Sequence, residues 1–263
     1  MSTSHSTPAP YRATIIRTLR AAGCVFAEDE AQLLIDAAPD RATLRSMVRR
    51  RVVGLPLEHI VGWADFCGLR IEVDPGVFVP RRRTELLAYR AVALTPPAAT
   101  IVDLACGSGA LGRVIADRVD GVSLHAADIE PAAVRCARRN LEPVGGRVYT
   151  GDLYEPLPDA LRGRVDVLVA NVPYVPSAAV DLLPPEARIH EPLVALDGGL
   201  DGLDVLRRVA VGAQDWLAPG GHLLLETGVD QVDAALAALA GAGLTPAVTG
   251  DEELHATVVI GRR

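Results

Sequence analysis

The sequence contains no lysine, and all 26 of its basic residues are arginines. A Schiff-base lysine and the lysine of a P-loop are therefore both excluded. The 33 acidic residues outnumber the arginines, so the formal net charge at pH 7 is −7. The excess lies in residues 101–263, with 13 arginines against 23 acids, whereas residues 1–100 carry 13 against 10. An acidic main body argues against stable nucleic-acid binding, which depends on phosphate contacts.

Cysteine is scarce, and its four copies form no C-x-x-C pair and have no paired histidine. This pattern fits neither a zinc site nor a disulfide scaffold, so we expect no metal, reduced thiols and a cytoplasmic protein. No apolar run approaches the roughly 20 residues of a membrane span, and no membrane partner is expected. Residues 1–10 lack the pattern of a secretory signal and are predicted to form a flexible tail. The four cysteines are Cys24, Cys67, Cys106 and Cys136.

Hydrophobic residues make up 49% of the chain, enough for a substantial core. Over residues 11–55 their spacing is helical, and Asp40 is a candidate N-cap. Over residues 56–79 isolated β-branched and aromatic residues among glycine and aspartate predict a β-hairpin linker. We therefore expect a small helical domain, a linker, and a main domain over residues 80–263.

The main domain alternates apolar, strand-like runs with helical stretches after residue 100. This alternation predicts an α/β fold with a mostly parallel, doubly wound sheet. The last two runs, at 244–250 and 255–262, are separated only by a short turn. Strands joined so tightly must pair antiparallel, so the parallel sheet is expected to end in a hairpin.

A glycine-rich loop, residues 105–109, joins the first of these strands to a helix. Glycines let the backbone turn tightly and approach a ligand. Asp128 ends the next strand, where a carboxylate can accept both hydroxyls of a ribose. These residues favour a site for S-adenosylmethionine (SAM). A dinucleotide site, which Gly112 would extend, and a purely structural turn remain alternatives.

The strand at residues 165–170 ends in Asn171-Val172-Pro173-Tyr174. Asparagine offers a carbonyl acceptor, proline stiffens the backbone, and tyrosine supplies a flat wall. These groups suit the binding of a planar NH₂ group. A plain turn that leaves a strand is the alternative.

The tetrapeptide resembles the [N/D/S]-P-P-[Y/F/W] motif of SAM-dependent methyltransferases that act on amino groups of planar amides or bases. Residues 54–87 resemble the linker that carries a P-R-P-x-T-E motif in protein-glutamine N(5)-methyltransferases of the HemK type. Residues 188–208 resemble that family's R-x-E-P-x-x-A-L-x-G-G-x-D-G segment. The resemblance runs from about Pro56 to Arg263 and covers most of the chain.

The resemblance implies a class I SAM-dependent methyltransferase, with a Rossmann-like seven-stranded sheet that ends in the antiparallel hairpin. Separately from the resemblance, the helical periodicity of residues 11–55 and their positive balance against an acidic main body predict that these helices recognise the protein substrate. The implied reaction is methyl transfer to the N5 amide nitrogen of a glutamine in a protein, a release factor or a ribosomal protein. Methylation of adenine N6 or guanine N2 in nucleic acid is the alternative. A non-catalytic binding module and an NAD oxidoreductase are weaker readings.

The resemblance also implies individual roles. The cofactor would be held at its methionine end by Ala105, Cys106, Gly107, Ser108 and Gly109, at its ribose by Asp128, and near its adenine by Asp152 and Leu153, with Pro80, Arg81, Thr84 and Glu85 closing the pocket. The substrate amide would be held by Asn171 and the backbone carbonyl of Val172, beside Pro173, with Tyr174 packed on it.

Two departures from the family pattern bear on specificity. Val172 stands where the motif has its first proline, and this change should matter little because the position acts through its backbone. Arg82 and Arg83 add two positive charges, for which a solvated face is the alternative reading. Together the departures suggest a paralogue with another protein substrate. His190 is a candidate general base, although a lone histidine is more often structural.

Overall fold

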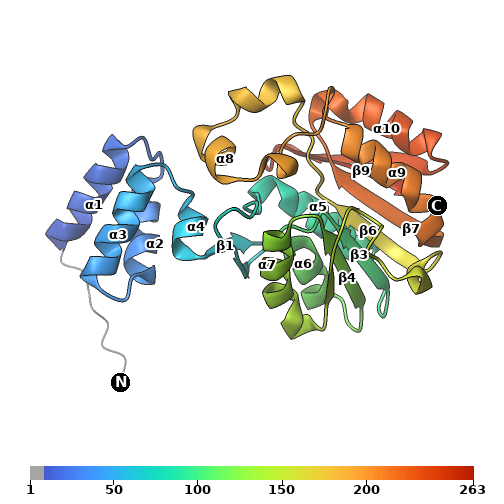
Figure 1. Ribbon diagram of the computed structural model, residues 1–263, viewed down its shortest axis with the longest axis horizontal. Coiled ribbons are helices and arrows are strands. Elements are labelled where there is room, and N and C mark those ends of the chain that lie inside the picture. Colours follow the sequence, from blue (N-terminus) through green and yellow to red (C-terminus); the bar gives the residue numbers. More distant parts are fainter. Residues whose placement is uncertain (1–8) are drawn as a thin grey trace.

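The computed structural model describes residues 9–263, with a bundle of helices at one end of the molecule and a helix-covered sheet at the other (Figure 1). Most of the expected tail, residues 1–8, lies outside the described residues, and the first helix already begins at Ala9. The N-terminal helices are α1 (Ala9–Ala21), α2 (Ala27–Ala37) and α3 (Arg41–Val52).

These three helices have a hydrophobic core of their own, with Leu19 and Leu34 fully buried. The side chain of Asp40 accepts a hydrogen bond of 2.8 Å from the backbone N–H of Thr43 and caps α3, which confirms the expected N-cap. The chain continues into a helix that the sequence pattern did not predict, α4 (Leu57–Val61), and then into the antiparallel hairpin β1 (Trp63–Phe66) and β2 (Leu69–Glu72).

The seven-stranded sheet has the order β5-β4-β3-β6-β7-β9-β8, with the five strands from β3 to β7 parallel and β9 antiparallel to both of its neighbours, β7 and β8. The expected fold class is thus confirmed. The strands are β3 (Thr100–Leu104), β4 (Ser123–Asp128), β5 (Arg147–Thr150), β6 (Val165–Ala170), β7 (Leu217–Glu226), β8 (Thr245–Asp251) and β9 (Ala256–Arg262).

Helices cover both faces of this sheet (Figure 1). One hydrophobic core joins the sheet to α5, α6 and α7, and a second joins it to α9 and α10. The inner strand β3 is therefore buried on both faces, as strands of parallel sheets are. The helices are α5 (Glu85–Leu94), α6 (Ala110–Arg118), α7 (Pro131–Leu141), α8 (Pro185–His190), α9 (Asp204–Trp216) and α10 (Val232–Gly241).

An arginine on α3 ties the N-terminal helices to the main domain. The Arg51 side chain, 12% exposed, pairs with Glu30 of α2 at 2.6 Å and with Glu186 of α8 at 3.1 Å. The two carboxylates thus hold one guanidinium from both sides. Helix α8 leads directly into the segment that borders the candidate site described next.

Candidate active site

The strand register brings four residues into a row at the carboxyl edge of the sheet. Leu104 of β3 is paired with Ala127 of β4 and with Ala170 of β6, and Ala170 is paired with Leu225 of β7. The next residue on each of these strands therefore stands beside its neighbours. The row reads Asp128, Ala105, Asn171, Glu226. Ligands of open α/β sheets bind at this edge.

A cavity with an empty volume of about 780 Å³, its open mouth included, lies over this row. Of the sequence-predicted site residues, those that line it are Pro80, Thr84, Ala105, Cys106, Gly107, Ser108, Asp128, Asn171 and Pro173. Its apolar walls come from the hairpin and the segments after it and after α8, with Phe66, Val77, Phe78, Pro192, Val194 and Ala195.

The loop after β3 needs glycine at two points for different reasons. Gly107 has a φ of +55°, a left-handed conformation that favours glycine. Gly109, with a φ of +79°, is the N-cap residue just before α6, and a Cβ there would lie 3.1 Å from the Leu141 side chain. Gly109 does not line the cavity, so its glycine serves the packing of α6 on α7. Ala105, also left-handed at +51°, places backbone strain at the cavity wall.

Asp128 organises this loop through both of its carboxylate oxygens. Oδ2 accepts a hydrogen bond from the N–H of Gly107, and Oδ1 accepts one from the N–H of Glu130, each at 2.8 Å. Burial raises the pKa of Asp128, and these two hydrogen bonds act against that rise. A carboxylate offers about four lone-pair sites. Each oxygen therefore keeps capacity to accept a hydroxyl from a ligand in the cavity.

A second carboxyl group lies beneath the loop. Asp103 is fully buried, and its Oδ2 accepts a hydrogen bond of 2.9 Å from the N–H of Gly112. Burial raises the pKa of Asp103 to about 8. At neutral pH this group is mainly protonated, so it supports the start of α6 without placing a second full charge beside Asp128.

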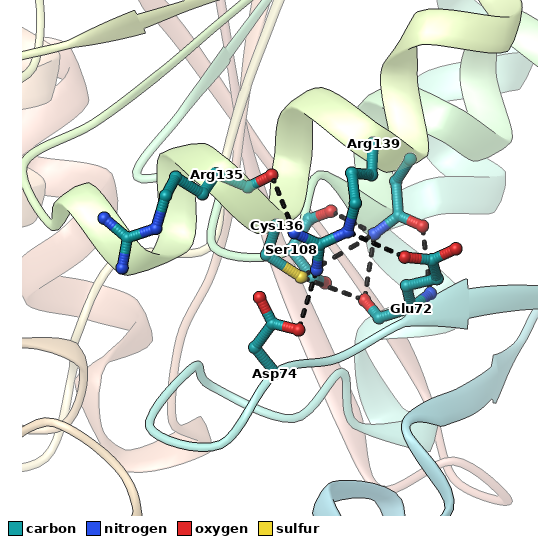
Figure 2. Close-up of polar contacts among 7 residues, drawn as sticks. Glu72, Asp74, Ser108, Arg135, Cys136 and Arg139 are labelled. Carbon is teal, nitrogen blue, oxygen red and sulfur yellow. Dashed lines mark hydrogen bonds and ion pairs between the residues drawn. The ribbon is translucent and has the colours of Figure 1, made fainter.

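A polar cluster fastens the hairpin and the glycine loop to α7 (Figure 2). The buried Asn140 amide donates to the carbonyls of Ser108 and Glu72, at 2.8 and 2.9 Å, and accepts from the Glu72 N–H at 2.9 Å. Arg139 pairs with Glu72 at 2.8 Å and with Asp74 at 2.7 Å. The hairpin linker is thereby held against the loop, and the segment that follows it is placed over the cavity.

Asn171 is oriented by a residue from the linker. Its Nδ2 lies 3.4 Å from Oγ1 of Thr84, and Thr84 is 3% exposed. Because the amide nitrogen is used in this contact, Oδ1 is left to accept hydrogen bonds. Val172 is 1% exposed and packs into the core, so its side chain is not available to a ligand. Asn171 and Pro173 line the cavity, and Val172 does not.

Tyr174 turns away from this cavity towards a buried acid. Its hydroxyl donates to Oε1 of Glu226 at 2.7 Å, and the Arg83 guanidinium stands 5.6 Å from the centre of its ring. Arg83 Nε also pairs with Glu226 at 3.2 Å. Burial and the neighbouring Glu226 carboxylate raise the pKa of Tyr174, so its hydroxyl stays protonated. Arg82 and Arg83 are both exposed, as a solvated face would be, and Arg83 in addition pairs with the buried Glu226.

Arg81 contacts residues of the cavity wall without lining the cavity itself. Its Nη2 donates to both oxygens of the buried Glu191, at 2.6 Å each, and its guanidinium lies 4.9 Å from the centre of the Phe78 ring. Both Phe78 and Pro192, the neighbour of Glu191, line the cavity. Arg81 itself does not, and its contacts fix two residues that do.

Three further residues that the sequence singled out lie apart from the cavity. Asp152 pairs with Arg208 at 2.6 Å, and Leu153 packs against the second core. His190 ends α8 and is not among the lining residues. Sequence reasoning gave no role to Glu191 and overlooked Glu226. Glu226 carries the same signal that singled out Asp128, an acid at the end of an apolar strand.

A family model described as "Methyltransferase small domain" matches residues 68–199, half of the chain. A release factor glutamine methyltransferase of Geobacter sulfurreducens is 37% identical over 224 residues, which cover 84% of this chain and 78% of that protein. The chain belongs to the release factor glutamine methyltransferase family. The family of this enzyme is therefore the one that the sequence motifs indicated.

Two further comparisons widen this picture. The 4-amino-L-phenylalanine/4-methylamino-L-phenylalanine methyltransferase of Streptomyces pristinaespiralis is 36% identical to the enzyme over 223 residues, covering 82% of this chain and 75% of that protein. The fold is shared with a methyltransferase of Pyrococcus furiosus, with a TM-score of 0.56, 17% identity, and coverage of 74% of this chain and 89% of that one. Relatives of similar identity thus have names that point to different substrates.

Within residues 9–263, no group of three or more histidine, cysteine, aspartate or glutamate side chains is placed to hold a metal ion. No helix in the same range is long and apolar enough to cross a membrane. The four cysteines are free thiols, and all are buried.

Proposed function

We propose that this methyltransferase uses SAM to methylate the side-chain amide nitrogen of a glutamine in a protein, with a peptide chain release factor as substrate and the cytoplasm as its compartment. The observation that carries the proposal is the placement of Asn171 beside Ala105 and Asp128 on the wall of one cavity. A group that accepts hydrogen bonds and a candidate nucleoside site thus face the same space.

The cavity fits SAM on three grounds. Asp128 has lone pairs left for the ribose hydroxyls, and residues 105–108 present backbone without bulky side chains. Phe66 and Phe78 add apolar wall. The bound cofactor would supply an electrophilic methyl group on a sulfonium. Gly109, Asp152, Leu153 and Arg81 would act outside direct contact, Arg81 through Glu191.

An amide nitrogen is a poor nucleophile because its lone pair is delocalised into the carbonyl, so orientation is the main help that the protein can give. Asn171 Oδ1 and the carbonyl of Val172 would accept the two N–H hydrogens and aim the nitrogen at the methyl group. These hydrogens become more acidic as charge develops, so the same contacts strengthen in the transition state. No histidine is found among the described residues that line the cavity, and the proposal therefore relies on positioning of the amide.

The experiment is to incubate the enzyme with isotopically labelled SAM and candidate release factors and ribosomal proteins, and to map the label by mass spectrometry. Label on one glutamine, lost when that glutamine is replaced by asparagine, is the expected result. A second candidate substrate is 4-amino-L-phenylalanine, because a relative of nearly equal identity is named for it. Methylation of this amine with no labelling of any protein would overturn the proposal.

A further inference from the structure

A second cavity lies next to the first at the same edge of the sheet. Arg83 and Tyr174 line the second cavity, and their chain neighbours Thr84 and Pro173 line the first. The two cavities are therefore separated by these two short pieces of backbone. The other walls are the end of β7 with the residues after it, and the turn between β8 and β9. Strand β9 is antiparallel to both β7 and β8, so β8 runs in the direction of the parallel strands. The turn between β8 and β9 therefore lies at the edge where the parallel strands end.

Glu226 is the buried acid of this cavity. Its side chain is 2% exposed, and Oε1 receives both the Tyr174 hydroxyl and Arg83 Nε. Within the described residues, Oε2 has no hydrogen-bond partner. A buried carboxylate oxygen without a donor is costly, since the group loses hydration and gains no replacement. The cavity thus contains an acceptor that a ligand can satisfy.

The charged residues that line the cavity indicate the charge of a complementary ligand. Three carboxylates line the cavity, Glu226 inside and Asp251 and Glu252 on the turn, against the one guanidinium of Arg83. The Glu252 side chain is exposed. The described residues provide no metal-binding cluster, so the complementary ligand is an organic cation that donates hydrogen bonds.

The second cavity lies close enough to Asn171 for one peptide to reach both. Asn171 and Glu226 follow paired residues of neighbouring strands, and neighbouring strands lie roughly 5 Å apart. In an extended chain, residues one or two places apart are separated by about 3.5–7 Å. A peptide whose glutamine reaches Asn171 can therefore place a side chain one or two positions away in the second cavity.

We propose that the second cavity binds a positively charged side chain of the protein substrate, located within two residues of the target glutamine, with Glu226 Oε2 as its acceptor. The proposal rests on the proposed glutamine methylation. It makes Glu226 a specificity-determining residue, and it gives Arg83 the task of holding Glu226 and Tyr174 in place while leaving Oε2 available.

The test uses the full-length enzyme and short peptides with a single glutamine. Arginine is placed in turn at each of the four positions within two residues of it, and each peptide is paired with one carrying neutral citrulline instead. Lysine peptides form a second arm. We expect one position at which arginine lowers KM by about tenfold relative to citrulline. This preference should disappear in Glu226→Gln and persist in Asp233→Asn, which removes an exposed charge outside the cavity.

Calorimetric binding of the same peptide pairs keeps the two proposals separate. If no peptide or protein is methylated, the proposed function fails, and the binding difference between arginine and citrulline still decides the cavity proposal. Equal binding at every position in the wild type, or a preference that survives Glu226→Gln, overturns it. Should Glu226→Gln fail to fold, the exposed rim variant Glu252→Gln must reduce the arginine preference.

Discussion

The buried carboxylate of Glu191 receives Arg81 Nη2 at 2.6 Å from each of its oxygens, across a sequence separation of 110 residues. This pair joins the linker before α5 to the segment after α8, and both segments line the candidate active site. Burial raises the pKa of Glu191, and the charge of Arg81 acts against that rise. The ion pair that holds these two cavity segments together therefore depends on the protonation state of Glu191.

Replacing Arg81 by methionine should destabilise the protein by about 2 kcal/mol at neutral pH, less than for a fully buried pair because Arg81 is one-third exposed. The loss of Arg81 raises the pKa of Glu191 further. A raised folded-state pKa gives stability that is present below the unfolded pKa and lost as pH rises through the folded one. The deficit of Arg81→Met should therefore be larger at pH 8 than at pH 5. Denaturant unfolding at both values measures it, with the exposed Arg82→Met as control. A deficit independent of pH would contradict this origin.

Asp128→Ala should weaken SAM binding by about 1–3 kcal/mol, because hydrogen bonds to a charged acceptor are lost and the loop loses its anchor at Gly107. Calorimetry measures the effect. Asp152→Ala is the matched control: the resemblance places Asp152 near the adenine, whereas the structure pairs it with Arg208 outside the cavity. We expect little change for Asp152. A larger loss of SAM affinity in Asp152→Ala than in Asp128→Ala would show that the nucleoside of SAM binds near Asp152 instead.

Asn171→Ala should lower kcat by on the order of a hundredfold, because a side-chain acceptor is lost where charge develops on the amide nitrogen. Val172→Pro should keep turnover within roughly tenfold, equivalent to about 1.4 kcal/mol, if only the carbonyl of this buried residue acts. SAM affinity should change much less than kcat in the Asn171 variant. Equal, mild effects of both changes on turnover would assign the tetrapeptide a structural role only.

Thr84→Val should lower kcat by about tenfold while leaving the overall shape of the side chain intact. The change removes the hydroxyl that holds Asn171 Nδ2, so the asparagine amide is free to rotate. Thr84→Ser restores the hydroxyl and should recover most of the turnover. Rates and SAM affinity are measured together. If serine and valine behave alike, the hydroxyl does not orient Asn171.

Deletion of residues 1–55 should spare SAM binding and the methylation of short glutamine peptides, and abolish the methylation of the whole protein substrate. The reason is that α1, α2 and α3 share a core separate from the two cores of the sheet. Rates on peptide and protein are compared for the truncated and full chains. Normal methylation of the protein by the truncated enzyme would remove the helices from recognition.

The parallel sheet and its terminal hairpin were predictable because period, strand length and turn length are local properties. Asp128 and Asn171 could be singled out for a related reason: strands of one parallel sheet end at one edge. Helix α4 escaped prediction because its five residues are too few to show a helical period. The partners of Arg83 and Arg81 could not be predicted, since Glu226 and Glu191 lie more than 100 residues away and only the folded chain brings them together.

Helix α8 is fastened at both ends by arginines from different parts of the chain. Glu186 in its first turn meets Arg51 of α3, and Glu191 just after its last residue meets Arg81. It therefore connects the N-terminal helices to the wall around Pro192. A tilt of the N-terminal helices must either break the contact between Arg51 and Glu186 or push on that wall. If the protein substrate docks on these helices, as predicted above, α8 connects the docking surface to the wall of the cavity.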